Sequence, residues 1–498
     1  MRIFLILFLI SVQLFSYDGE DKVKKHFKVP KVKVKTPSLL RKDGFMSDKE
    51  LKDFIGGIHF KGKHTKVNLF GPTTGGHLIP LVVIGKNKVI DKNKPTVMLV
   101  AQQHGDEPMG ADVLLGTIKR LARWDLEYLL DDINVVVLPR LNPDGAENGK
   151  RHTHRGKDMN SDHTILQTKE ALLMKQIFNR YKPDVVLDIH EYIADGHSYS
   201  KIIKDGAVPY YDILFLSSTN PNYSERLKNY AYNIVLKDVE KDCKKKGYST
   251  NYYYNPFRKP KGSEPMKLYV ASGTAGIARN AYALNGTLSF LIELRGKGIG
   301  RENIERRLDS GLSAVESFLI SVAKNGRSLN KLVEEEKNRV SETISITWEF
   351  LGKKGTLALI NTKTGEIEKI KTINYVPQNP KIRLKRPMPT AYILDKNEKT
   401  AATILKNHGI KVLVTNKSMD TYVDEYTVYK GRRVKIKTKI KKVKKQIPKG
   451  SFVVPVNQKN SNFIGTLLEP EGDSSFVARS VIKIRNKKLP IYRYHGNI

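Results

Sequence analysis

The chain has very little cysteine: Cys243 is the only one among its 498 residues. One cysteine excludes an intrachain disulfide, and it also excludes a metal site built mainly from thiolates. Long apolar runs are missing as well, because no segment after residue 15 is apolar over enough residues to cross a membrane. We therefore expect a globular protein whose stability comes from its hydrophobic core.

Acidic residues are few relative to basic ones, with 51 Asp+Glu against 87 Lys+Arg and a formal net charge of +36. Such an excess favours anionic surroundings, and an anionic envelope surface is one expected partner. The lysines are spread over the whole chain, however, so we interpret most of them as a solvated basic surface. We expect no nucleic-acid partner, because the lysine-rich residues 434–443 contain no interleaved aromatic side chains.

The N-terminus is typical of a secretory signal peptide. Arg2 supplies the positive charge, residues 3–15 are almost entirely apolar, and Ser16 is a small residue suited to cleavage. We expect residues 1–16 to be removed and the mature protein to be secreted or periplasmic. Residues 17–46 are basic and lack a clear pattern, which predicts a flexible lead-in segment.

Apolar, strand-like runs alternate with amphipathic segments over residues 47–330. This rhythm predicts an α/β domain with a mixed, mostly parallel sheet that helices cover on both faces. The expected strands are residues 78–85, 95–101, 133–139, 184–189 and 287–294, and the expected helices are 110–123, 167–181, 222–246 and 303–325. In such sheets, ligands bind at the carboxyl ends of the strands.

The character of the chain changes past about residue 340. Short alternating segments separated by turn residues predict a smaller, β-rich accessory domain over residues 340–498. Its expected strands are residues 344–359, 392–394, 412–415, 422–434, 434–443, 451–456 and 463–468. In residues 434–443 lysines alternate with apolar side chains, which is typical of an exposed edge strand. We assign no chemistry to this region.

The most informative motif is His104-Gly105-Asp106-Glu107, which directly follows the strand-like residues 95–101. An imidazole and a carboxylate three residues apart at a strand end can be directed at one point above a sheet. His190 follows the apolar residues 184–189, so it also lies at a strand end. Two histidines and one glutamate leave zinc a fourth position for water, which is typical of a hydrolytic site. By contrast, His152 and His154 lie in a predicted loop and are expected at the surface.

Glu293 ends the apolar residues 287–292. A carboxylate in that place is costly unless it has a partner or a function. One interpretation is a structural ion pair with Arg295; the other is a general base beside an activated water.

Residues 142–145, Asn-Pro-Asp-Gly, predict a turn, since proline fixes φ and glycine accepts positive φ. The cluster of Arg, Asn and Asp after this turn is suited to binding a carboxylate and to bracing a metal-bound imidazole.

In this order, the motifs His-x-x-Glu, Asn-Pro-Asp-Gly, Arg…Asp-x-Asn, Asp-x-His and Glu-Leu-Arg resemble the zinc carboxypeptidase family of metallopeptidases. The resemblance covers roughly residues 50–325. It implies an eight-stranded mixed sheet flanked by helices, and a metallocarboxypeptidase that hydrolyses peptide bonds; the N-terminal signal pattern adds the expectation that this enzyme is exported. It also implies one zinc ion per chain, bound by His104, Glu107 and His190, with Glu293 as the general base that activates water.

The same resemblance assigns roles to three further residues. Arg151 would polarise the scissile carbonyl, and Asn160 would help to hold the terminal carboxylate of the substrate. Asp158 would fix the tautomer of the first histidine ligand.

One position departs from the family pattern. Members carry Asn-Arg where this chain has Asn160-Ser161, and serine cannot make a bidentate charged contact with a carboxylate. Arg279 and Arg155 are candidates for a replacement cation. Tyr282 and Tyr269 are candidates for the tyrosine that caps the substrate.

Two other functions remain open. A zinc amidase or deacylase would act on N-acyl amino acids or on cell-wall stem peptides, so the substrate is either a peptide or derived from peptidoglycan. The missing arginine and the basic, exported character favour this alternative. A non-catalytic module that binds acidic polymers belongs to a different class, and the presence of all three ligands together with Glu293 argues against it.

Overall fold

The computed structural model describes residues 20–497 except 201, 204, 257–264, 270 and 432–435. The predicted signal peptide over residues 1–16 and the start of the lysine-rich residues 434–443 lie outside this described part. No helix in the described part is long and apolar enough to cross a membrane.

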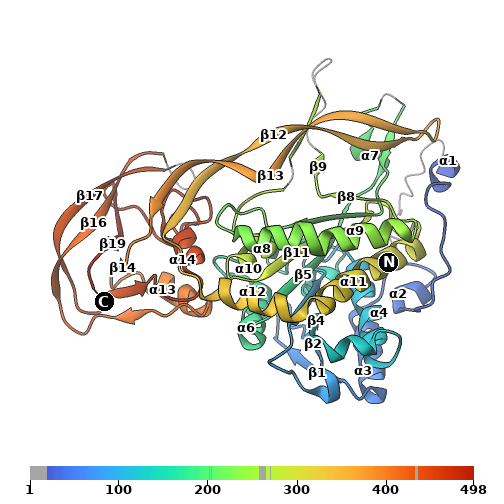
Figure 1. The fold of residues 1–498 in the computed structure, drawn as a ribbon, viewed down its shortest axis with the longest axis horizontal. Coiled ribbons are helices and arrows are strands. Elements are labelled where there is room, and N and C mark those ends of the chain that lie inside the picture. The colour runs from blue at the N-terminus through green and yellow to red at the C-terminus, as the bar shows by residue number, and fades with distance from the viewer. Residues whose placement is uncertain are drawn as a thin grey trace, which may run out of the picture.

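The largest sheet has eight strands in the order β1-β2-β4-β3-β5-β11-β7-β8 (Figure 1). The central strands β4, β3, β5 and β11 are parallel to one another, whereas β2 and β7 pair with this group antiparallel. The predicted mixed α/β sheet is therefore confirmed. The strands are β1 (Thr65–Phe70), β2 (Ile79–Ile84), β3 (Thr96–Ala101), β4 (Asn134–Leu138), β5 (Val185–Ile193), β7 (Ile213–Ser217), β8 (Thr250–Tyr252) and β11 (Leu288–Lys297).

Helices cover both faces of this sheet because its central strands carry apolar side chains on both sides. In β3, Val97 and Leu99 belong to a core cluster shared with α3, α4, α9 and α11, while Met98 and Val100 belong to a second cluster shared with α6 and α10. The alternation follows the two-residue period of a strand. The helices are α3 (Asp48–Lys61), α4 (Met109–Arg123), α5 (Pro143–Glu147), α6 (Lys169–Tyr181), α7 (Gly196–Tyr199), α8 (Glu225–Tyr230), α9 (Leu236–Lys245), α10 (Ala278–Ala283), α11 (Ile304–Lys324) and α12 (Gly326–Asn338).

The described part of the lead-in packs against the rest of the chain. It contains the short helices α1 (Glu20–Lys24) and α2 (Pro37–Leu40). Val34 and Met46 enter the main core, and Val23 and Phe27 form a small cluster with Val208. Apolar side chains spaced among the lysines thus hold this segment in place, where we expected a flexible one.

A long hairpin of β12 (Thr343–Asn361) and β13 (Ile367–Pro387) runs back over the sheet-bearing part of the chain (Figure 1). It forms a five-stranded sheet, in the order β6-β12-β13-β10-β9, with β6 (Ala207–Pro209), β10 (Met266–Tyr269) and β9 (Asn255–Pro256). This pairing joins segments from both sides of residue 340. The domain boundaries 47–330 and 340–498 therefore stay a proposal.

A third sheet, with six strands in the order β15-β18-β14-β19-β16-β17, forms the C-terminal module, which we define as residues 391–494. The module lies at one end of the molecule in Figure 1. Its elements are β14 (Ala391–Leu394), α13 (Lys399–Asn407), β15 (Leu413–Val414), β16 (Met419–Lys430), β17 (Lys437–Ile447), β18 (Phe452–Pro455), α14 (Ser461–Leu468) and β19 (Lys488–Tyr494).

One predicted strand of this module is wrong. Residues 463–468 belong to the helix α14, which buries Phe463, Ile464, Leu467 and Leu468. The spacing of these four residues places them on one face of a helix. The strand β13 and the helix α13 were not predicted at all.

Candidate metal centre and active site

The His104–Glu107 turn joins β3 to α4 and is held by the Asn-Pro-Asp-Gly segment. The amide of Asn142 donates to the carbonyl of Gln103 (3.1 Å), and the N–H of Gly105 donates to the carbonyl of Arg151 (3.3 Å). A Cβ at Gly105 would lie 2.1 Å from the carbonyl carbon of Gly145, so only glycine fits there. The predicted turn at residues 142–145 thus forms the first turn of α5 and fixes the backbone between His104 and Glu107.

His190 and Glu293 are brought together by the parallel pairing of β5 and β11, in which they are register partners. Both residues lie within the carboxyl-terminal halves of their strands, rather than just past the strand ends. The sheet therefore places His104, Glu107, His190 and Glu293 at one edge, as the sequence predicts.

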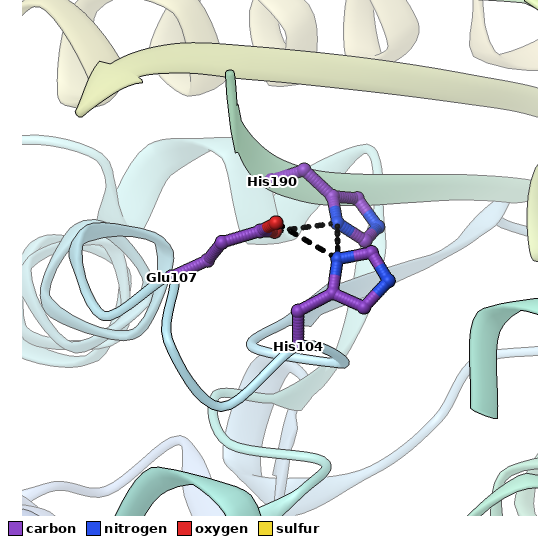
Figure 2. Close-up of side chains that lie close together, drawn as sticks. All are labelled: His104, Glu107 and His190. Carbon is purple, nitrogen blue, oxygen red and sulfur yellow. Dashed lines mark hydrogen bonds and ion pairs between the residues drawn. The ribbon is translucent and has the colours of Figure 1, made fainter. Parts of the chain in front are cut away.

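Three of these side chains converge on one point (Figure 2). His104 Nδ1 lies 2.9 Å from one Glu107 oxygen, His190 Nδ1 lies 2.8 Å from the other, and the two Nδ1 atoms are 3.1 Å apart. All three residues are buried. Two imidazole nitrogens that face each other beside a carboxylate form a donor set suited to a divalent metal ion.

The outward nitrogens of both imidazoles have carboxylate partners. His104 Nε2 lies 3.3 Å from Asp158, and His190 Nε2 lies 3.0 Å from Asp188. Burial alone would raise the pKa of each aspartate, but the neighbouring histidine, together with Arg151 at Asp158 and Gln103 at Asp188, lowers the pKa of Asp158 and of Asp188 below the usual range. Such carboxylate–imidazole pairs orient metal-ligating histidines.

Sequence reasoning missed the role of Asp188. The signal was present, because Asp188 precedes His190 by two residues in a strand and so lies on the same face of the sheet.

The donor set fits zinc in number and kind, because it offers two imidazole nitrogens and one carboxylate. The second nitrogen of each imidazole is held by an aspartate. A second cluster, Asp48, His77 and Glu147, also has ligand-type atoms close together. It suits a metal less well, because His77 and Glu147 are partly or fully exposed and Lys52 Nζ already lies 2.5 Å from Asp48.

Glu293 differs from the other buried carboxylates of the site because no hydrogen bond or ion pair joins it to the described residues. The alternative partner, Arg295, donates instead to the carbonyl of Pro209 and lies 4.2 Å from the ring of Phe27. Burial raises the pKa of Glu293 to about 7. A carboxylate with that pKa is suited to accept and return a proton near neutral pH.

The four residues line a cavity of about 410 Å³ together with Arg151, Asp158, Asn160 and Arg279. Arg151 donates to Asp158 (2.9 Å) and also lies 3.4 Å from Glu107. The carbonyl of the Asn160 amide accepts from the N–H of Ala278 (2.9 Å), and its Nδ2 lies 3.4 Å from His190 Nε2. Both residues therefore stand at the rim of the metal centre.

Of the remaining residues for which the sequence predicts a place or a role, some line the cavity and others lie outside it. Arg279 lines the cavity, and His152, His154 and Arg155 are exposed at the surface. Tyr282 is buried, with its hydroxyl 3.4 Å from His163 Nδ1, and it is not among the lining residues. We therefore do not propose Tyr282 as a residue that contacts the substrate.

The wall of the cavity is also held from the C-terminal module. The hydroxyl of Ser474 accepts from the N–H of Ala275 (2.8 Å) and lies 2.8 Å from the hydroxyl of Thr274, which lines the cavity. Arg479 donates to the same Thr274 hydroxyl at 3.2 Å. These contacts were not predictable, because the sequence assigned no role to the module.

Comparisons with known proteins agree with this geometry. The model of a family described as zinc carboxypeptidase matches residues 60–325, more than half of the chain. Carboxypeptidase 2 of Trichophyton tonsurans is 29% identical over 421 residues, which cover 80% of this chain and 77% of that protein. Carboxypeptidase D of Homo sapiens is 30% identical over 161 residues, which cover 27% of this chain and 11% of that protein.

Among solved structures, a metallo-carboxypeptidase from Burkholderia cenocepacia is 19% identical with a TM-score of 0.43, covering 56% of this chain and 70% of that one. The family match, together with a group of two histidines and a glutamate that could hold a metal ion, identifies a zinc-dependent metallopeptidase. The chain belongs to the zinc carboxypeptidase family.

Proposed function

We propose that this protein is an exported metallocarboxypeptidase that hydrolyses a peptide bond with Glu293 as its general base. The observation that carries the proposal is the buried carboxylate of Glu293, to which the described residues give no hydrogen bond or ion pair, in one cavity with the His104, Glu107 and His190 donor set. A carboxylate kept unpaired in a buried place costs stability, and such costs are typical of functional sites.

His104, Glu107 and His190 would hold the zinc ion. When bound, the zinc supplies Lewis acidity and lowers the pKa of a water molecule in the site. Asp158 and Asp188 hold the two imidazoles in the orientation and tautomer that leave Nδ1 free as a donor.

Glu293 takes a proton from the attacking water and later returns it to the leaving amine. Its raised pKa suits both steps, because a base with a pKa near the working pH accepts a proton and releases it with little bias. Arg151 would stabilise the negative charge that develops on the scissile carbonyl oxygen, since its guanidinium lines the same cavity. Asn160 would contact the terminal part of the peptide.

Export is supported by the N-terminal residues 2–16, whose pattern is that of a signal peptide. Release into the envelope would bring the enzyme to peptides, including peptidoglycan-derived ones. The net charge of +36 would favour additional contact with an anionic envelope surface.

Hydrolysis of N-blocked dipeptides with free carboxyl ends tests the proposal. We expect release of the C-terminal amino acid, loss of activity on treatment with a chelator, and recovery with Zn²⁺. Hydrolysis confined to N-acyl amino acids or to stem peptides would support the amidase alternative instead. A zinc-loaded protein inactive on all three substrate classes would contradict both.

A further inference from the structure

Residue 161 offers no cation to the cavity. Ser161 is exposed, and its hydroxyl donates to the backbone carbonyl of Asp158 at 2.8 Å. If the substrate carries a carboxylate into this cavity, another basic side chain must bind it. Apart from the metal-ligating histidines, the basic side chains that line the cavity are Arg151, Lys297 and Arg279.

Two of these three cations already have carboxylate partners. Arg151 forms an ion pair with Asp158 at 2.9 Å, and Lys297 forms one with Asp106 at 2.6 Å. Their charges are therefore largely balanced within the protein. A substrate carboxylate that approached either of them would compete with an existing partner.

Arg279 is different. It is only 4% exposed, and its Nη2 donates to the carbonyl of Ser272 (3.0 Å) and to the hydroxyl of Thr219 (3.3 Å). Both of these acceptors are uncharged. Its Nε has no hydrogen-bond partner, and within the described part of the chain no carboxylate forms an ion pair with it.

A buried guanidinium without an ion-pair partner is costly, and only the more distant charges of Glu293 and Asp188 act on Arg279. Burial lowers the pKa of Arg279 below the usual arginine value, but arginine remains charged in proteins. The two neutral hydrogen bonds fix the direction of the guanidinium, and its Nε is enclosed by protein atoms without an acceptor. A carboxylate bound at the side of the guanidinium that lines the cavity would add the ion pair that the described residues do not supply.

We propose that Arg279 is a specificity-determining residue that binds a carboxylate of the substrate, at a cavity where residue 161 supplies no cation. This inference rests on the proposed peptidase function. The carboxylate has two sources, the free α-carboxylate of the terminal residue and an acidic side chain on that residue. Either source gives the same prediction: the enzyme selects an anionic terminal residue through Arg279.

Binding measurements on the zinc-loaded enzyme separate this inference from the proposed function. The probes are N-acetyl dipeptide analogues in which a methylene ketone replaces the scissile amide, so that no turnover is needed. Four probes end in Glu or Gln, each with a free or an amidated carboxyl end. Hydrolysis of the matching true peptides is measured separately and reports on the proposed function alone.

We expect the wild-type protein to bind at least one carboxylate-bearing probe about tenfold or more tightly than its neutral counterpart. The R279Q variant should lose that ratio. Loss of the ratio between free and amidated ends identifies the α-carboxylate, and loss of the ratio between Glu and Gln identifies the side chain. The R279K variant keeps the charge without the planar fork and should keep part of the ratio.

Arg155 is a matched control, because it is an exposed arginine outside the cavity lining. The R155Q variant should bind all four probes as the wild type does. Zinc content and melting temperature establish that each variant is folded, and R279K carries the test if R279Q does not fold. Equal weakening of all four probes on loss of Arg279, or no preference in the wild type, would overturn the inference.

Discussion

Two of the buried clusters of charged side chains in the described part of the chain differ in how their carboxylates are paired. In the C-terminal module and the adjoining end of β13, Glu469 accepts from Arg386 (2.7 Å), Tyr392 (2.8 Å) and Tyr426 (3.1 Å). Arg386 also donates to Glu471 at 2.6 Å. Each carboxylate of this cluster has a cationic partner.

The metal centre is arranged in the opposite way. Glu293 is buried beside two histidines and a second glutamate, yet the described residues supply it with no hydrogen bond or ion pair. The consequence appears in the pKa values. The pKa of Glu471 is lowered because Arg386 outweighs its burial, whereas burial raises that of Glu293 to about 7. The ion-paired carboxylates of the C-terminal module are therefore expected to stabilise the fold. The unpaired carboxylate of Glu293 is expected to take part in proton transfer.

The largest expected effect is on turnover at the unpaired carboxylate. The E293Q variant keeps the shape of the side chain but cannot accept the proton, so kcat should fall by about 10²–10⁴-fold. Zinc content, measured by atomic emission, should stay at one ion per chain, and stability should not decrease. Retention of wild-type kcat would mean that Glu293 is not the base.

A change in the ion-paired cluster around Glu469 should lower stability and leave the metal centre unaffected. The E469A variant removes the buried carboxylate that Arg386 and Arg493 share, so that Arg386 keeps only Glu471 and Arg493 keeps only Asp424. The free energy of unfolding should therefore fall by about 3 kcal/mol, measured by urea denaturation. Zinc content should not change. The exposed Glu366 is the control, since E366Q should change stability by less than about 0.5 kcal/mol. A loss no larger than that of the control would remove the distinction between the two clusters.

The partners of the histidine ligands should affect the metal rather than the fold. The D158N variant loses the negative charge beside His104 Nε2, so zinc affinity should fall by about 10–100-fold. Competition with a coloured chelator measures this affinity. An unchanged affinity would show that Asp158 only pairs with Arg151.

The pH profile gives a smaller and graded effect. Glu293 must be unprotonated to act as a base, so kcat/KM should fall tenfold per pH unit below its pKa. Burial raises that pKa to about 7, and a bound cation lowers it, so the midpoint of the acid limb should lie between about 4.3, the usual value for glutamate, and about 7. The residual activity of the E293Q variant should not show this fall at acid pH. If the fall persisted in E293Q, the acid limb would belong to another titrating group.

The structure brings the predicted ligands His104, Glu107 and His190 together, and each of these positions has a local signal in the sequence. His104, Glu107, His190 and Glu293 all follow or end strongly apolar runs, and parallel strands bring such positions to one edge of a sheet. The central strands of the mixed sheet were predictable for the same reason, since their apolar runs are long and regular, whereas the strands β1, β7 and β8 and the helices α3 and α12 were not predicted.

The rest depended on contacts that no local pattern encodes. Whether Arg279 has an ion-pair partner depends on the side chains that tertiary packing places around it. The contact of Ser474 with Ala275 joins residues far apart in the chain. The short apolar run at residues 463–468 is compatible with either a strand or a helix, and packing in the module selects the helix. The hairpin of β12 and β13 is hard to predict because many lysines interrupt the alternation of apolar and polar side chains along its strands.

Anomalous diffraction at the zinc edge tests the central claim most directly. Crystals of the zinc-loaded protein should show one strong peak within bonding distance of His104 Nδ1, His190 Nδ1 and Glu107, with the Glu293 carboxylate facing it across the cavity. No peak at that place, or a peak only at the Asp48, His77 and Glu147 cluster, would contradict the account.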